Sequence, residues 1–380
     1  MKQRLEVRGQ KLEKTTITSL SQVPVFGCNE RNIEHAARII ADGGVGAFPT
    51  ETVYGLGGDA ANPVAVARIY EAKGRPGDNP LIVHIADLAD FCKIAGDAPA
   101  YAYALMDAFW PGPLTLVAQK KEGLPSWLGG HPKGTADTIG IRMPSHPMAL
   151  AMIRESGCFI AAPSANKAGT PSPTRACHVA TDFSDGSIDF ILDGGAVPGG
   201  LESTVVDVTG VAPVILRPGT ITPEMIAEVT GLEINIGQSR NDGEPLPLSD
   251  SAPRSPGMKY RHYAPKAPMT LIIGSECDIA AYIVTQGDEM HNRKVGILVT
   301  SQTKAQLDAC NFKKDSANIL ILGDKAIPES IARNLYACLR QFDVIGVDII
   351  FAEGPSQKGL GLAIMDRMKK AAEGRVIHVS

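Results

Sequence analysis

Short apolar runs separated by helical stretches make up the chain from residue 269 to its end. Four of these runs read MTLIIG, VGILVT, ILILGD and FDVIGVDIIFAE. Strand-like runs of this length that alternate with helices are typical of a parallel sheet built from βαβ units. A final helix is predicted over residues 360–373, where one apolar face repeats every four residues, at Leu360, Ile364, Met368 and Ala372.

The chain before residue 269 divides into further regions. Residues 30–232 mix strand-like apolar runs, short helices and loops rich in Gly and Pro. Residues 233–268 contain six prolines, many polar residues and no apolar periodicity, which predicts a long linker. We therefore predict an α/β protein with an N-terminal extension at 1–29, a larger domain at 30–232, this Pro-rich linker, and a smaller Rossmann-like α/β domain at 269–380.

Composition excludes several classes of protein. Of the 380 residues, 44% are hydrophobic and 21% are charged, as in ordinary globular proteins, so bulk disorder is not expected. Residues 30–220 hold 14 Lys and Arg against 20 Asp and Glu, and only 5% of the whole chain is aromatic. Proteins that bind nucleic acid without regard to its sequence need a basic surface, and those that bind single strands add aromatic platforms. The larger domain is therefore a poor candidate for such binding.

The cysteines and the first residues of the chain indicate a cellular compartment. The seven cysteines are scattered and include no C-x-x-C pair, so neither a disulfide framework nor a zinc site is expected. No apolar run reaches the ~18 residues of a membrane-spanning helix. The first residues, MKQRLEVRGQKLEK, are polar and basic and lack the apolar core of a secretory signal. We therefore expect a cytoplasmic protein that does not contact membranes.

Four cations stand at turns or beside apolar runs in this acidic domain. Lys73 and Arg75 belong to KGRPGDNPL, which follows a predicted helix and also contains Asn79. Arg142 lies within IGIRMP, and Arg217 lies within LRPG. A cation beside apolar neighbours needs an acidic partner or an anionic ligand, and phosphate suits both Lys and Arg. These residues are consistent with a focused anion site or with structural ion pairs, and KGRPGDNPL does not have the spacing of a P-loop.

Small polar side chains follow strand-like runs at further places. PTETVYGLG contains Thr52, PSAN contains Ser164 and Asn166, and GLESTVVD contains Ser203. Hydroxyls, amides and free backbone N–H groups in Gly-rich loops can approach a phosphate or another small polar ligand closely. Each motif alone is typical of a turn that a hydroxyl stabilises. Together, polar groups at several strand ends are typical of an α/β binding site.

The order of these motifs resembles the YrdC family, the L-threonylcarbamoyladenylate synthases. The matching motifs are PTETVYGLG, KGRPGDNPL, PGPLT, IGIRMP, PSAN, GLESTVVD and LRPG, which follow the family's order between residues 44 and 219. SPGMKYRHYAP at 255–265 and GLGLAIMDRM at 359–368 resemble the family's long, two-domain form, although Asp366 stands where Asn is expected. The resemblance implies a twisted mixed sheet around a central cavity, together with the smaller domain.

The same resemblance implies an activity. A nucleotidyltransferase would convert L-threonine, bicarbonate and ATP to L-threonylcarbamoyl-AMP and pyrophosphate. The product would pass to a tRNA threonylcarbamoyltransferase complex, so the enzyme would reach tRNA only indirectly, in the first step of threonylcarbamoyladenosine modification. Magnesium is expected with ATP, and no protein ligand is assigned to it.

Each matching residue takes a role that the resemblance implies. The catalytic positions are Lys73, Arg75, Ser164 and Asn166. The ATP-binding positions are Arg75, Asn79, Thr138, Ala162, Ser164, Ser172, Arg217 and Tyr263. The threonine-binding positions are Thr52, His84, Arg142 and Ser203, of which Arg142 suits the amino-acid carboxylate. His84 lies in the apolar run LIVHI, where a histidine is otherwise a buried core residue.

The linker and the alternatives complete the prediction. Arg261, His262 and Tyr263 are predicted to fold over the cavity as a lid that excludes water, with Tyr263 touching the nucleotide. The carbamoyltransferase of hydrogenase maturation also has a YrdC-like domain, but its C-x-x-C pairs are missing from this chain. A protein that binds double-stranded RNA or tRNA through a YrdC-like domain is the alternative from another class, and the acidic charge argues against it.

Overall fold

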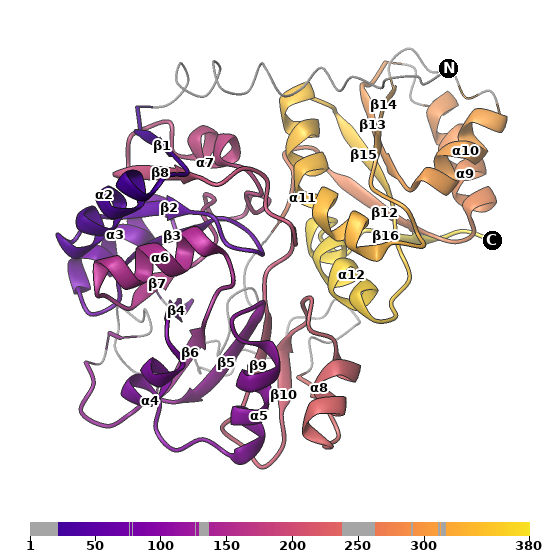
Figure 1. Ribbon diagram of the computed structural model, residues 1–380. Helices are drawn as coiled ribbons and strands as arrows, with labels where there is room; N and C mark the ends of the chain where they lie inside the picture. Colours follow the sequence, from indigo (N-terminus) through magenta and orange to yellow (C-terminus); the bar gives the residue numbers. More distant parts are fainter. Residues whose placement is uncertain are drawn as a thin grey trace, which may run out of the picture.

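The computed structural model describes residues 22–75, 77, 79–125, 127–128, 137–237, 263–289, 292–310, 312 and 317–380. Two separate sheets organise these residues (Figure 1). A mixed sheet of 11 strands belongs to the larger domain, and a sheet of 5 strands belongs to the smaller one. The predicted α/β class and the presence of a second, smaller α/β domain are confirmed.

The strands of the larger sheet are short. They are β1 (Val25–Gly27), β2 (Gly46–Phe48), β3 (Gly55–Asp59), β4 (Ile82–His84), β5 (Leu114–Gln119), β6 (Thr138–Arg142), β7 (Ile160–Ala162), β8 (Phe190–Asp193), β9 (Thr204–Asp207), β10 (Val214–Arg217) and β11 (Asn235–Ile236). Their spatial order is β1-β8-β2-β3-β7-β4-β6-β5-β9-β10-β11. The helices are α2 (Glu30–Ala41), α3 (Pro63–Lys73), η1 (Leu88–Asp90), α4 (Phe91–Ile94), α5 (Ala100–Phe109), α6 (Pro147–Ser156), α7 (Ala176–Asp182) and α8 (Pro223–Thr230).

Local sequence signals set both ends of α3. The Asn62 side chain accepts hydrogen bonds from two backbone N–H groups of the first turn, and Pro63 is the first helical residue. Gly74 ends the helix with φ of +59°, in the left-handed region that glycine adopts without strain. Lys73 therefore occupies the last turn, directly before the loop that carries the other cation of its motif.

The larger sheet begins within the segment that the sequence set apart as an extension at 1–29. β1 pairs in parallel with β8, so Val25 lies opposite Ile191 and Phe26 lies opposite Leu192. Residues 25–27 of this segment therefore form an edge strand of the larger sheet. Residues 1–21 lie outside the described residues.

The smaller sheet is parallel throughout its described pairs. Its strands are β12 (Met269–Ile273), β13 (Val295–Val299), β14 (Ala317–Ile321), β15 (Ile349–Glu353) and β16 (Val376–His378), in the spatial order β14-β13-β15-β12-β16. Its helices are α9 (Glu276–Glu289), α10 (Ser301–Ala309), α11 (Pro328–Ile345) and α12 (Leu360–Ala371), and α12 confirms the predicted final helix. Within the described ranges, no helix is both long and apolar enough to cross a membrane.

One predicted strand in this domain was wrong over half of its length. The run FDVIGVDIIFAE covers the end of α11 and all of β15, with Gly346 between them at φ of +71°. The residues before this glycine continue the amphipathic face of a long helix, and Phe342 is fully buried there. Apolar composition alone cannot separate the end of a buried helix from a buried strand.

Helices α11 and α12 lie between the smaller sheet and the larger domain (Figure 1). Val53 and Leu201 of the larger domain join the hydrophobic cluster that contains Leu335 and Tyr336 of α11. The backbones approach closely at Gly200, where a Cβ atom would come within 2.4 Å of a backbone oxygen of α11. The two domains therefore share a packed interface rather than meeting only through the linker.

Candidate active site

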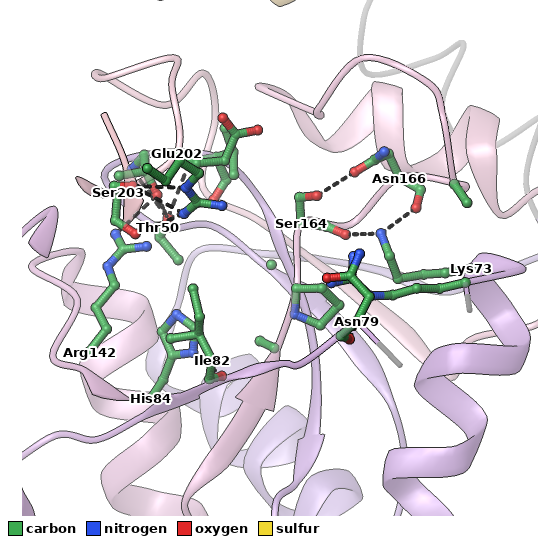
Figure 2. A pocket seen from close by; sticks show the side chains of 18 of the residues that line it. Thr50, Lys73, Asn79, Ile82, His84, Arg142, Ser164, Asn166, Glu202 and Ser203 are labelled. Carbon is green, nitrogen blue, oxygen red and sulfur yellow. Dashed lines mark hydrogen bonds between the residues drawn. The ribbon is translucent and has the colours of Figure 1, made fainter. Parts of the chain in front are cut away.

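One pocket of the larger domain collects most of the residues that the sequence singled out (Figure 2). Twelve of the fourteen predicted site residues line it: Thr52, Lys73, Arg75, Asn79, His84, Arg142, Ala162, Ser164, Asn166, Ser203, Arg217 and Tyr263. Its space is about 840 Å³, including the open mouth.

Strand pairing places two of the predicted threonine-binding residues, His84 and Arg142, beside each other. β4 and β6 run parallel in a register that sets His84 directly opposite Arg142. On the other side of β4, the antiparallel strand β7 sets Ala162 opposite Ile82. The pocket therefore lies where three central strands end or begin, as is typical of α/β sites.

The Lys73 ammonium group is enclosed at the end of α3. Its Nζ donates to the carbonyl oxygen of Ser164 and, at 2.5 Å, to that of Asn166. The Ser164 hydroxyl in turn donates to Oδ1 of Asn166 at 2.6 Å. Burial, and then the nearby Arg75 charge, lower the pKa of Lys73 well below its ordinary value. A bound anion would oppose this shift and favour the charged form, which indicates that Lys73 faces an anionic ligand.

Arg75 and Asn79 form the adjoining wall of the pocket. Nε of Arg75 donates to the Asn79 carbonyl at 3.3 Å, and Nη2 donates to the Pro80 carbonyl at 3.1 Å. Asn79 is buried, and its Oδ1 atom has no hydrogen-bond partner among the described residues. A buried acceptor without a donor costs about 1–3 kcal/mol. This oxygen therefore indicates a ligand that brings its own N–H or O–H group.

Arg142 stands on the opposite side of the pocket from Lys73 (Figure 2). Its Nη2 atom donates to Oε1 of Glu51 at 2.6 Å and to Oγ1 of Thr52 at 3.0 Å, and its Nε atom donates to the Gly112 carbonyl at 3.3 Å. Its Nη1 atom makes no hydrogen bond to any of the described residues. The guanidinium therefore keeps donors for a second carboxylate.

His84 is a neutral imidazole in this site. Its Nδ1 atom donates to the Ile82 carbonyl at 3.1 Å, and its ring meets the Phe48 ring edge-on. Burial, and then the Arg142 charge, lower the pKa of His84 to about 3. At neutral pH the ring can therefore contact a ligand without adding charge.

Ser203 and Arg217 form a buried group where β9 begins and β10 ends. Arg217 donates from Nε and Nη2 to the Ser203 carbonyl at 3.2 and 3.1 Å, and from Nη2 to the Ser203 hydroxyl at 3.2 Å. That hydroxyl also lies 2.7 Å from Oγ1 of Thr115. Burial lowers the pKa of Arg217, so its charge gains from a nearby anion.

Glu202 lines the pocket but was not among the predicted site residues. Its carboxylate accepts from the Ser172 hydroxyl at 2.5 Å, the Tyr336 hydroxyl at 3.0 Å and Nε of Arg367 at 2.9 Å. The motif GLESTVVD contains Glu202, so the sequence pointed to this segment. Its partners in α11 and α12 are 134 and 165 positions away, and no local pattern links them to it.

The remaining predicted residues have three different positions. Thr138 begins β6 and Ser172 lies behind Glu202, and neither is part of the pocket wall. Tyr263 lines the pocket and stacks on Tyr336 with ring centroids 5.4 Å apart. Arg261 and His262, with the rest of the predicted lid before Tyr263, lie outside the described residues.

The described part of the pocket does not fit a resident magnesium ion. Nowhere in the described ranges are three or more His, Cys, Asp or Glu residues grouped to hold a metal. Glu202 is the one carboxylate on the described pocket wall, and its oxygens already accept from Ser172, Tyr336 and Arg367. A metal that enters this site must therefore be held largely by its own ligand.

These features define a two-domain α/β protein with a small-molecule pocket, cationic on one side for phosphate and fitted for a carboxylate on the other. Comparisons with known proteins give its relatives. Residues 38–219 match the Sua5_yciO_yrdC model, described as "Telomere recombination", and residues 221–373 match Sua5_C, described as "Threonylcarbamoyl-AMP synthase, C-terminal domain". The chain belongs to this Sua5/YciO/YrdC family, in the form that carries the Sua5 C-terminal domain.

Individual relatives cover nearly all of the chain. A threonylcarbamoyl-AMP synthase of Bacillus subtilis is 48% identical over 92% of this chain and 95% of its own length. One of Schizosaccharomyces pombe is 38% identical over 90% of this chain and 88% of its own. The crystal structure of Pyrococcus abyssi Sua5 complexed with L-threonine is 44% identical, covers 94% of this chain and 99% of that one, and gives a TM-score of 0.82. The resemblance found in the sequence motifs is confirmed.

Proposed function

We propose that the protein is an L-threonylcarbamoyladenylate synthase, which converts L-threonine, bicarbonate and ATP to L-threonylcarbamoyl-AMP and pyrophosphate. One observation carries the proposal: Lys73, Arg75 and Arg142 line a single pocket, and Lys73 and Arg142 lie on opposite sides of it (Figure 2). The first pair suits phosphate groups, and Arg142 suits an amino-acid carboxylate. The printed names of the Bacillus and Schizosaccharomyces relatives and the L-threonine bound to Pyrococcus Sua5 support this assignment.

The reaction needs little covalent chemistry from the protein. The amino nitrogen of threonine bonds to the carbon of bicarbonate, water leaves, and a carbamate results. A carbamate oxygen then bonds to the α-phosphorus of ATP while the bond from that phosphorus to pyrophosphate breaks. No intermediate is bonded to a side chain, so the protein acts by positioning the reactants and stabilising charge.

On the threonine side, Arg142 binds the carboxylate through the nitrogen that Glu51 does not use. Thr52, His84 and Ser203 contact the rest of the amino acid. The neutral state of His84 suits this role, because a protonated ring would place a second positive charge beside the substrate's amino group. The support is the geometry of the wall and the family relationship.

On the nucleotide side, Lys73 and Arg75 stabilise the charge on the α-phosphate and on the departing pyrophosphate. Ser164 and Asn166 hold Lys73 in place through their carbonyl groups. The other ATP-contacting positions on the pocket wall are Asn79, Ala162, Arg217 and Tyr263, whereas Thr138 and Ser172, which the resemblance also implies, lie off that wall. Because the described pocket wall offers no free carboxylate, magnesium enters as the MgATP complex, held by the phosphates.

The proposal extends to a pathway position. The protein is a cytoplasmic nucleotidyltransferase of tRNA modification, and its labile product passes to a tRNA threonylcarbamoyltransferase complex. The pathway position rests on the family resemblance and on the chemistry of the product. The product is a mixed anhydride, which water hydrolyses unless a following enzyme uses it first.

The test is the co-substrate dependence of pyrophosphate release from MgATP by the full chain. Release should require both L-threonine and bicarbonate, and isotope from bicarbonate should appear in a product with the mass of threonylcarbamoyl-AMP. Release without threonine, or no release with all three substrates, would mean that the pocket serves another reaction.

A lysine pair then places the reaction in this pocket. Lys73→Met should lower the rate of pyrophosphate release about 10³-fold, because it removes a donor that stabilises developing charge. Lys167→Met is the matched control, since Nζ of Lys167 donates to the Ala72 carbonyl and Asp185 outside the pocket wall. Its rate should stay within about twofold of wild type, as expected for a surface pair. Equal rates for the two variants would remove Lys73 from the mechanism.

A further inference from the structure

The carboxylate of Glu202 is shared between the two domains. It belongs to the pocket wall of the larger domain and is 6% exposed. Three donors surround it: the Ser172 hydroxyl from the same domain, and the Tyr336 hydroxyl and Arg367 guanidinium from α11 and α12. The smaller domain therefore supplies two of the three groups that hold a pocket residue.

Arg367 reaches three separate segments that contribute to the pocket. Nε donates to Glu202 at 2.9 Å, and Nη2 donates to the Pro218 carbonyl at 2.9 Å, next to Arg217. Its guanidinium also lies over the Tyr263 ring, 5.4 Å from the ring centre. Asp366 pairs with Nη1 and so holds the guanidinium from the other side. No part of Arg367 is exposed, so this single side chain of α12 acts as a fixed brace.

The charge of Arg367 also has a consequence for Arg217. Burial by itself would raise the pKa of Glu202, but Arg367 and then Arg217 lower it to about 2, so the carboxylate is ionised. Without Arg367, the nearest cation able to compensate this buried charge is Arg217. The Arg217 guanidinium would then be drawn towards Glu202 and away from Ser203, where it now lies.

We propose that Arg367 is a positioning residue for the nucleotide side of the pocket: by neutralising and holding Glu202, it keeps Arg217 and Tyr263 in place for ATP. In this proposal the smaller domain completes the ATP site without itself contacting ATP. The assayed reaction rests on the proposed function, whereas the binding measurement below does not.

A second ion pair at the same interface separates this role from general stability. Arg340 of α11 pairs with both oxygens of Asp182 at 2.9 and 2.7 Å, and Nη2 also donates to the Pro171 carbonyl. Both partners are largely buried, as in the Arg367–Glu202 pair. Neither Arg340 nor Asp182 lines the pocket. Arg340→Met is therefore the matched control for Arg367→Met.

The experiment compares these two variants of the full chain. Equilibrium binding of MgATP alone and of L-threonine alone is measured by calorimetry, and the KM of each substrate by pyrophosphate release. For Arg367→Met we expect the ATP dissociation constant and KM to rise about 30-fold, as for loss of one buried charge contact. The threonine values should stay within about threefold, because the Ser203 hydroxyl is still held by Thr115. Arg340→Met should leave the dissociation constants and KM values of both substrates within about threefold of wild type. Its loss of thermal stability should be similar to that of Arg367→Met.

A double variant tests the reason. Glu202→Gln combined with Arg367→Met removes both charges and keeps an acceptor for Ser172, so ATP affinity should return to within about fivefold of wild type. This variant also decides the matter if Arg367→Met alone does not fold. Weakened binding of both substrates in Arg367→Met, an equal ATP defect in Arg340→Met, or no recovery in the double variant would overturn the proposal. If wild type binds MgATP but makes no product, the proposed function fails while this inference is still decided by the binding constants.

Discussion

The two domains both bury charged side chains at the ends of helices or strands, but they use them differently. In the smaller domain, Glu353 at the end of β15 is fully buried and accepts from Thr300, and Nζ of Lys325 lies 2.8 Å from its other oxygen. Lys325 also pairs with Glu276. In the larger domain, the hydrogen-bond partners of Lys73 among the described residues are neutral carbonyl groups.

This difference separates a binding site from a structural network. Buried charges that neutralise one another leave no net charge for a ligand to compensate. A buried ammonium bonded to carbonyls, beside an amide oxygen with no described partner at Asn79, is a site that a ligand completes. A buried charged side chain therefore indicates a binding site only when other charged side chains of the protein do not neutralise it.

The largest effect should come from the larger domain, at Arg142. Arg142→Met should raise the KM for threonine about 100-fold, because a charged pair with the substrate carboxylate is lost. The KM for ATP should stay within about threefold. Steady-state pyrophosphate release measures both. Arg154→Met is the control, since Arg154 donates to the Ala86 carbonyl away from the pocket wall. Equal rises for the two substrates would contradict a threonine-side role.

The next effect should be on stability alone, in the smaller domain. Glu353→Gln should lower the free energy of unfolding by about 1–3 kcal/mol, because Lys325 loses its buried partner. Both KM values should stay unchanged, since Glu353 and Lys325 are not part of the described pocket wall. Urea unfolding and pyrophosphate release measure the two results. Glu276→Gln removes the exposed partner of the same lysine and should cost under about 0.5 kcal/mol. A change in KM would show that the network belongs to a site.

The smallest effect concerns pH and His84. The folded pKa of about 3 lies below the ordinary value of 6.5, so the ring stays neutral from pH 5.5 to 8. The affinity for threonine should show no His84 titration there, and His84→Gln should not change the shape of the pH profile. The sign for stability follows from the same shift: between pH 6.5 and 3 only the unfolded state binds this proton, so stability falls as pH falls. An inflection near pH 6.5 that His84→Gln removes would contradict the neutral ring.

The sequence predicted most of the residues that line the pocket because they lie in local motifs. Lys73 ends a helix whose cap residues are adjacent in the chain, and Ser164 and Asn166 follow a strand directly. Such local signals depend on neighbouring residues, so they can be read without the fold. The same reasoning failed at residues 342–345, where an apolar run is compatible with either a helix or a strand.

The sequence by itself determined the α/β class, the presence of a second α/β domain and most of the residues that line the pocket, because periodicity, caps and motifs are local properties. Only the tertiary structure decided which charges are compensated. Glu202 became a buried, ionised carboxylate because Arg367, 165 positions later, is brought to it by the packing of α12 against the larger domain. Coulomb interactions depend on distance and burial in space, and neither is a property of position along the chain.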